Sequence, residues 1–163
     1  MGGGRILEVN TCFINLGRKV TIQYIRSVEV GGTSVPLLVA QTAVAAGYPS
    51  PAQDYFDGTI NLSEHLIHDT TSTFIVRVSG CSMEGAGISD GDELIVNRAR
   101  KPVDGSIVVA VLDGEMTVKR LRLTPRGVVL QAENPHYPDL VVGELASLTV
   151  WGVAETCLHQ LLA

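Results

Sequence analysis

The sequence predicts a mainly β protein, a compact antiparallel β fold with a flexible N-terminal arm. Short runs rich in Val, Ile, Thr and Tyr recur along the chain, and residues of these types favour strands. Asp-Gly and Arg-Gly pairs stand between the runs from residue 90 onward, where tight turns are expected. Parallel strands are usually joined by long helices, and the sequence predicts no series of such helices. An antiparallel arrangement is therefore favoured.

The first third of the chain differs from the rest in its residue composition and predicted organisation. Two strands are expected at residues 6–14 and 20–30, so a helix-turn-helix module, which needs two helices, is not predicted there. Small residues dominate 35–47, and the prolines at 49 and 51 favour an extended or turn conformation after them. We therefore expect an N-terminal extension of unknown role (1–34), an accessible arm and linker (35–51) and one domain (52–163).

Within that domain the expected elements follow one another closely. A short helix or loop is expected at 52–67. Six strands are expected after it, at residues 74–78, 93–96, 106–112, 116–123, 128–130 and 148–153.

Composition excludes several classes of protein. The 163 residues, 45% of them hydrophobic, suit one domain with its own core. The formal net charge of −5 disfavours a protein that coats DNA, although seven of the twelve Lys and Arg residues fall within 98–126. No apolar run approaches the roughly 18 residues of a membrane span. Direct nucleic-acid binding and a membrane location are therefore not expected.

Metal and cofactor chemistry has little support in the sequence. The three cysteines show no CxxC spacing, and His65 and His68 have no further ligand cluster near them. No metal and no cofactor are therefore expected, and the cysteine pattern favours a reducing compartment, which suggests a cytoplasmic protein.

A serine turn follows the strand predicted at 74–78. The run Ser-Gly-Cys-Ser-Met at 79–83 could present a hydroxyl together with neighbouring backbone N–H groups, as an oxyanion site requires. Composition does not choose between Ser79 and Ser82 as the nucleophile. The alternative is an ordinary Ser-Gly turn with no chemistry.

Lys119 is a candidate base because of its place in a strand. Alternation puts it on one face with Thr117, Leu121 and Leu123. Apolar neighbours lower the pKa of a lysine, so its neutral amine can accept a serine proton near neutral pH. The alternative is a solvent-facing lysine on an edge strand. None of the four histidines stands in a spacing that suggests a catalytic triad.

Three motifs resemble the LexA-type self-cleaving serine peptidase family, whose fold is shared with signal peptidases. They are Val-Ser-Gly-Cys-Ser-Met at 78–83, Gly-Ile-Ser-Asp-Gly-Asp-Glu-Leu-Ile-Val at 87–96 and Asp-Gly-Glu-Met-Thr-Val-Lys-Arg-Leu at 113–121. Residues 47–55 further resemble the segment after the cut in the UmuD-type branch. The resemblance implies a Ser-Lys dyad of Ser82 and Lys119, cleavage of the chain's own arm between Ala46 and Gly47, and oxyanion donors on the backbone of Cys81 and Ser82.

The same resemblance implies a function in the SOS DNA-damage response. It implies cleavage stimulated by the RecA filament, and a shortened homodimer that serves an error-prone, UmuC-type translesion DNA polymerase as its regulatory subunit. One alternative is a LexA-like or phage-like transcriptional repressor, which needs a DNA-binding module before the arm. Another is a non-catalytic binding module, for which loss of Ser82 or Lys119 is expected, yet both are present.

Overall fold

The computed structural model describes residues 21–27, 36–40 and 56–161. Within these ranges the chain forms ten strands, one short α-helix and one 3₁₀ helix. The strand expected at 6–14 and the predicted cleavage bond between Ala46 and Gly47 lie outside the described residues.

Eight strands form one sheet, in the order β1-β4-β5-β10-β6-β7-β8-β9, and every neighbouring pair is antiparallel. The strands are β1 (Thr21–Ser27), β4 (Thr73–Ser79), β5 (Glu93–Asn97), β6 (Ile107–Leu112), β7 (Glu115–Thr124), β8 (Gly127–Gln131), β9 (Leu140–Val141) and β10 (Leu148–Leu158). The mainly antiparallel β fold and the six strands predicted between 74 and 153 are thereby confirmed.

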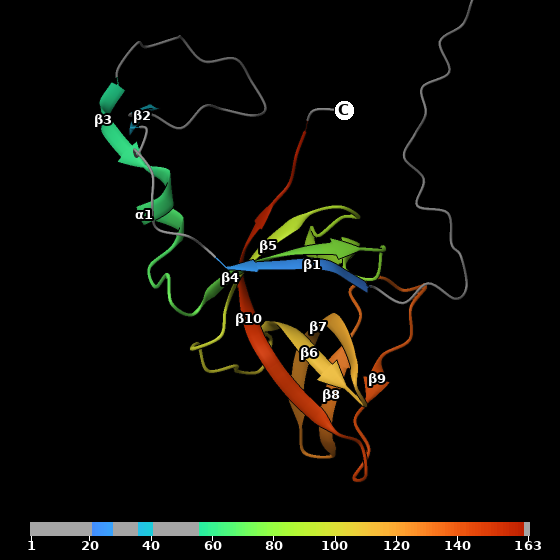
Figure 1. The fold of residues 1–163 in the computed structure, drawn as a ribbon. Helices are drawn as coiled ribbons and strands as arrows, with labels where there is room; N and C mark the ends of the chain where they lie inside the picture. Colours follow the sequence, from blue (N-terminus) through green and yellow to red (C-terminus); the bar gives the residue numbers. More distant parts are fainter. Residues whose placement is uncertain (1–20, 28–35, 41–55, 162–163) are drawn as a thin grey trace, which may run out of the picture.

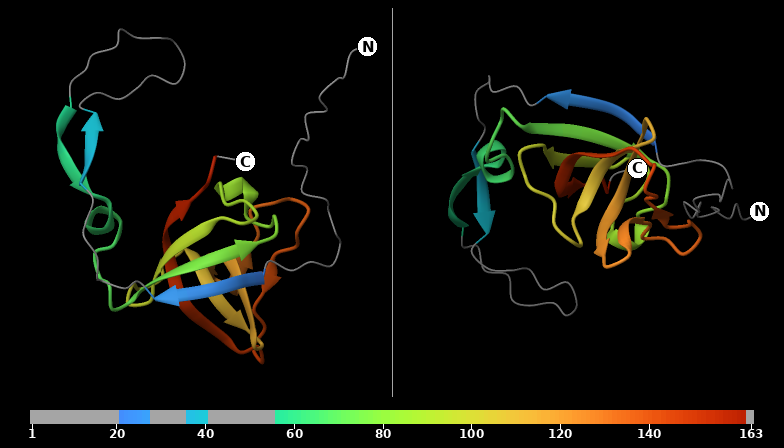
Figure 2. Two further views of the ribbon diagram at one scale, coloured as in Figure 1. Left: turned by 45° about the horizontal axis from the view of Figure 1, so that its top comes forward. Right: turned by 90° about the horizontal axis from the view of Figure 1, so that it is seen from below.

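The long strand β10 joins the two halves of this sheet (Figure 1). One end pairs with β6 and the other with β5, and the register shifts between Val150 and Gly152 and again between Ala154 and Thr156. Such irregularities bend a strand and increase its twist. The sheet curls so far that β1 also contacts β7 (Figure 2).

Two clusters of buried side chains form the core. The first consists of Val76, Val78, Met83, Ile88, Leu94, Val96, Val109 and Val118. The second consists of Val108, Ala110, Leu121, Leu130 and Val153. Neighbouring residues of β6 thus enter different clusters, because successive side chains of a strand point to opposite faces.

A second, two-stranded sheet stands away from the first in all the views (Figures 1 and 2). It pairs β2 (Pro36–Ala40) with β3 (Phe56–Asn61), and α1 (Leu62–Leu66) follows directly. Asn61 caps this helix by accepting a hydrogen bond from the Ser63 amide at 3.1 Å. The expectation of a helix or loop at 52–67 is therefore wrong for β3, which owes its extended form to its pairing with a distant segment.

The segment before the arm contributes to the main sheet. β1 lies within the strand expected at 20–30 and pairs with β4 along its length. Part of the predicted extension 1–34 is thus the edge strand of the eight-stranded sheet.

Candidate active site

Ser82 lies in a tight turn that leaves β4. Gly80 at the start of the turn and Gly87 after it have positive φ angles of 97° and 75°, which glycine adopts without steric penalty. The Asp90 carboxylate accepts a hydrogen bond from the Gly80 amide at 2.6 Å and ties the turn to the next loop. The 3₁₀ helix η1 (Glu84–Ala86) follows. Ser82 is fully buried.

Lys119 reaches this serine from the middle of β7. Its backbone pairs with Val108 of β6, and its Nζ donates a hydrogen bond to Ser82 Oγ at 2.7 Å. Nζ also donates to the Val118 carbonyl at 2.9 Å and to Thr117 Oγ1 at 3.4 Å. Thr117 shares the face of Lys119, as strand alternation predicts.

The burial of Lys119 alters its chemistry. The residue is only 5% exposed, and burial lowers its pKa from 10.5 to about 8 because the charged ammonium loses hydration. A substantial fraction of the amine is therefore neutral at mildly alkaline pH. A neutral amine in contact with a buried hydroxyl can accept its proton.

The segment between β8 and β9 closes over the serine turn. The Glu133 amide donates to the Ser82 carbonyl at 2.9 Å, and the Glu133 carbonyl accepts from the Gly85 amide at 2.7 Å. The Glu133 carboxylate also pairs with Arg120, which is next to Lys119 on β7. Glu133 thus connects the turn that carries Ser82 to the strand that carries Lys119.

Asn134, the next residue, holds the same turn through its side chain. Its Nδ2 donates to the Cys81 carbonyl at 2.8 Å and to a Glu84 carboxylate oxygen at 3.3 Å. Its Oδ1 accepts from the His136 amide at 3.0 Å and closes a local turn.

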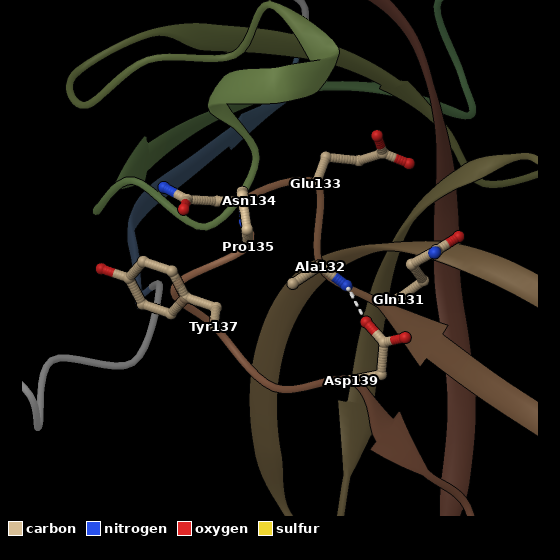
Figure 3. A pocket seen from close by; sticks show the side chains of 7 residues that line it. All are labelled: Gln131, Ala132, Glu133, Asn134, Pro135, Tyr137 and Asp139. Atoms are coloured by element: carbon tan, nitrogen blue, oxygen red, sulfur yellow. Dashed lines mark hydrogen bonds between the residues drawn. The ribbon is translucent and has the colours of Figure 1, made fainter.

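This segment also lines an open, largely polar pocket of about 490 Å³ (Figure 3). Among its lining residues, the Ala132 amide donates a hydrogen bond to the Asp139 carboxylate at 2.9 Å. Its lining residues are Gln131, Ala132, Glu133, Asn134, Pro135, Tyr137 and Asp139. The pocket lies beside the serine turn, because Glu133 and Asn134 line the pocket and also form hydrogen bonds with the turn.

The structure brings together Lys119 and Ser82, two of the residues singled out in the sequence. The hydroxyl that Lys119 contacts belongs to Ser82, and Cys81 is buried beside it. Sequence reasoning missed Glu133 and Asn134. The Asn-Pro pair at 134–135 is a turn signal, but nothing in the sequence connects that turn to Ser82.

Among the described residues, no histidine side chain forms a hydrogen bond with Ser82 or Lys119. His159 lies against Asp92, with Nδ1 2.7 Å from a carboxylate oxygen. In the described part of the chain no group of three or more His, Cys, Asp or Glu side chains could hold a metal ion. Likewise, none of the described helices is long and apolar enough to cross a membrane.

Comparison with known proteins identifies relatives of this chain. Residues 36–155 match the family described as Peptidase S24-like. The chain is 44% identical to protein SamA of Salmonella typhimurium over 115 residues, which cover 71% of this chain and 79% of SamA. It is 40% identical to protein MucA of Escherichia coli over 128 residues, 78% of this chain and 86% of MucA. Identity to the LexA repressor of Delftia acidovorans is 45% over 111 residues, 68% of this chain and 49% of that repressor.

Proposed function

Because the chain belongs to the Peptidase S24-like family, we propose that it is a self-cleaving serine peptidase of the SOS DNA-damage response. Ser82 is its nucleophile, Lys119 its general base, and the bond between Ala46 and Gly47 its substrate. The observation that carries the proposal is the buried hydrogen bond of 2.7 Å between Lys119 Nζ and Ser82 Oγ. A base in direct contact with the nucleophile is the arrangement that activates a serine.

The reaction follows from this contact. Ser82 Oγ attacks the Ala46 carbonyl carbon while Lys119 takes the hydroxyl proton. The carbon–nitrogen bond to Gly47 then breaks, and Lys119 returns the proton to the departing amine. Water hydrolyses the resulting ester and regenerates Ser82. Backbone N–H groups of Cys81 and Ser82 stabilise the negative oxygen that develops on the carbonyl.

The active site needs no high affinity for the segment that it cleaves, because that segment belongs to the same protein. Holding the two groups in one molecule raises their effective concentration greatly. Control then acts on whether the arm occupies the site, and on the protonation of Lys119. We assign stimulation of arm docking to the RecA filament, in the cytoplasm, as the resemblance to UmuD-type proteins implies.

The shortened product acts, in this proposal, as a homodimeric regulatory subunit of a UmuC-type translesion polymerase. The described part of the chain before the arm supports this over a repressor. Residues 21–27 form a strand of the sheet, whereas a helix-turn-helix module consists of helices.

The test is intact-mass analysis of the purified chain after incubation at increasing pH, and separately with activated RecA filaments. We expect a fragment that begins at Gly47. Its rate of formation should rise about tenfold per pH unit and level off near the Lys119 pKa of about 8, since only the neutral amine is a base.

Ser82→Ala and Lys119→Ala are the matched controls, and both should remain folded and uncut. Normal processing in either variant would contradict the dyad. An unchanged mass of the folded wild-type protein under every condition would favour the non-catalytic binding module.

A further inference from the structure

We propose that Asn134 is a positioning residue that sets the direction of the Ser82 backbone N–H, the oxyanion donor. This inference rests on the proposed function and adds to it a residue outside the dyad. Its basis is the way in which two consecutive residues, Glu133 and Asn134, hold the two peptide groups on either side of Ser82.

The peptide group before Ser82 is held through its carbonyl. Asn134 Nδ2 donates to the Cys81 carbonyl at 2.8 Å, and the Glu84 amide donates to the same oxygen at 3.4 Å. No cis peptide bond occurs in the described residues, and in a planar trans peptide the C=O and the following N–H point in opposite directions. The hydrogen bond that turns the Cys81 carbonyl toward Asn134 therefore turns the Ser82 N–H away from it.

The peptide group after Ser82 is held as well. The Glu133 amide donates to the Ser82 carbonyl at 2.9 Å. With both flanking peptide groups held, the backbone of Ser82 has little freedom to rotate. In the described part of the chain the Ser82 N–H donates to no acceptor, so it remains available for a developing oxyanion. Donors of this kind act by being oriented before the reaction begins.

The variant Asn134→Asp tests the donor role of Nδ2 while keeping the turn that Oδ1 closes at residues 134–136. The variant keeps Oδ1, which accepts from the His136 amide, and replaces only Nδ2. A carboxylate oxygen would then face the Cys81 carbonyl and the Glu84 carboxylate, which repel it. Asn134→Ser is a neutral second variant, because it removes Nδ2 but leaves a short hydroxyl that can still accept from the His136 amide.

The matched control is Asn97→Asp. Asn97 Oδ1 likewise accepts backbone amides, those of Ala99 and Arg100 at 2.9 and 3.1 Å. Its Nδ2 donates to nothing within the described residues, so the same chemical change removes no donor there. We expect its self-cleavage rate to equal that of the wild type.

The readout is the rate of self-cleavage on the alkaline plateau, where Lys119 is neutral. We expect Asn134→Asp and Asn134→Ser to lower the plateau rate about 10- to 100-fold, the scale set by loss of an oxyanion donor, with thermal midpoints close to that of the wild type. A variant that acted only through Lys119 would regain the wild-type rate at high pH. A wild-type plateau rate in both folded Asn134 variants, or recovery of that rate at high pH, overturns the inference.

A second readout separates this inference from the proposed function. Labelling by a fluorophosphonate forms a bond between Ser82 Oγ and phosphorus and expels fluoride, while Lys119 takes the proton, so it needs the oxyanion donor but not the arm. If the wild type is labelled but never cut, self-cleavage is contradicted, whereas slower labelling of Asn134→Asp still supports the inference. Equal labelling rates overturn it. A wild type that is neither cut nor labelled contradicts both.

Discussion

Lys119 and Ser82 meet at one hydrogen bond, but the chain holds them in place in different ways. Lys119 lies in the middle of β7 and pairs with Val108 of β6. The strand as a whole has ladder partners on both sides, because β6 pairs with residues 115–120 and β8 with residues 120–124. Ser82 lies in a turn outside the ladder, where hydrogen bonds with Asp90, Glu133 and Asn134 hold the backbone.

This difference indicates where the site is robust and where it is fragile. A strand inside a sheet keeps its register even when one side chain changes, because many ladder bonds and buried contacts specify it together. The serine turn has no ladder partners, so apart from the burial of Met83 in the core it depends on fewer hydrogen bonds than the strand does. We therefore expect the geometry of the site to be more sensitive to changes in the turn than to changes at the surface of the strand.

The largest effect is expected from removal of the amine. Lys119→Met keeps most of the buried volume but leaves Ser82 without a base, so self-cleavage should disappear at every pH. The variant should also be more stable than the wild type at pH 7, because burying an ammonium is unfavourable. Urea unfolding of both proteins at several pH values measures the difference.

The sign of that stability difference depends on pH. The pKa of Lys119 is about 8 in the folded protein, whereas an ordinary, solvent-exposed lysine has a pKa of 10.5. Between these two pH values the unfolded chain therefore binds more protons than the folded protein. Wild-type stability should therefore rise through this window, by about 3 kcal/mol in all, relative to Lys119→Met. Burial raises the pKa of Cys157 to about 12, which acts in the opposite direction but equally in both proteins. A constant difference between the two proteins from pH 7 to about pH 11 would contradict the burial of a titrating amine.

A smaller effect is expected from crowding the turn. At Gly85 an added Cβ would lie 2.4 Å from the Glu133 carbonyl oxygen, so Gly85→Ala must push residues 133–134 away from the turn. We expect a loss of about 1–3 kcal/mol in stability and a self-cleavage rate at least about tenfold lower.

Gly143→Ala is the control for Gly85→Ala, because an added Cβ there meets nothing within 4 Å. Its stability and its cleavage rate should match those of the wild type. If Gly85→Ala also behaves as wild type, the contact of Glu133 with the turn does not position Ser82.

The smallest effect is expected on the exposed side of β7. Arg122 is three residues beyond Lys119, and its side chain reaches Gln131 at 2.9 Å and Asp104 at 3.5 Å, both near solvent. Exposed pairs of this kind contribute little, so Arg122→Ala should change stability by no more than about 0.5–1 kcal/mol. Its self-cleavage rate should be unchanged. A large loss of cleavage would show that the strand is as fragile as the turn.

Much of this arrangement could be predicted from local pattern. Alternation in residues 115–123 correctly placed Lys119 with Thr117 on one face of a strand, because side-chain direction in a strand follows from sequence spacing alone. Runs of β-branched residues located the strands. The strand at 56–61 was missed because its partner β2 is distant in sequence, and pairing overrides weak local preference.

The sequence by itself determined the strands, their antiparallel class and the candidacy of Ser82 and Lys119, since these depend on neighbouring residues or on recognisable motifs. Only the tertiary structure decided that Glu133 and Asn134 hold the serine turn. Residues 82 and 134 are far apart along the chain, and the contact between them exists because a curled sheet brings the β8–β9 segment over the end of β4. No local propensity encodes a contact of that kind, because it depends on how the whole sheet closes.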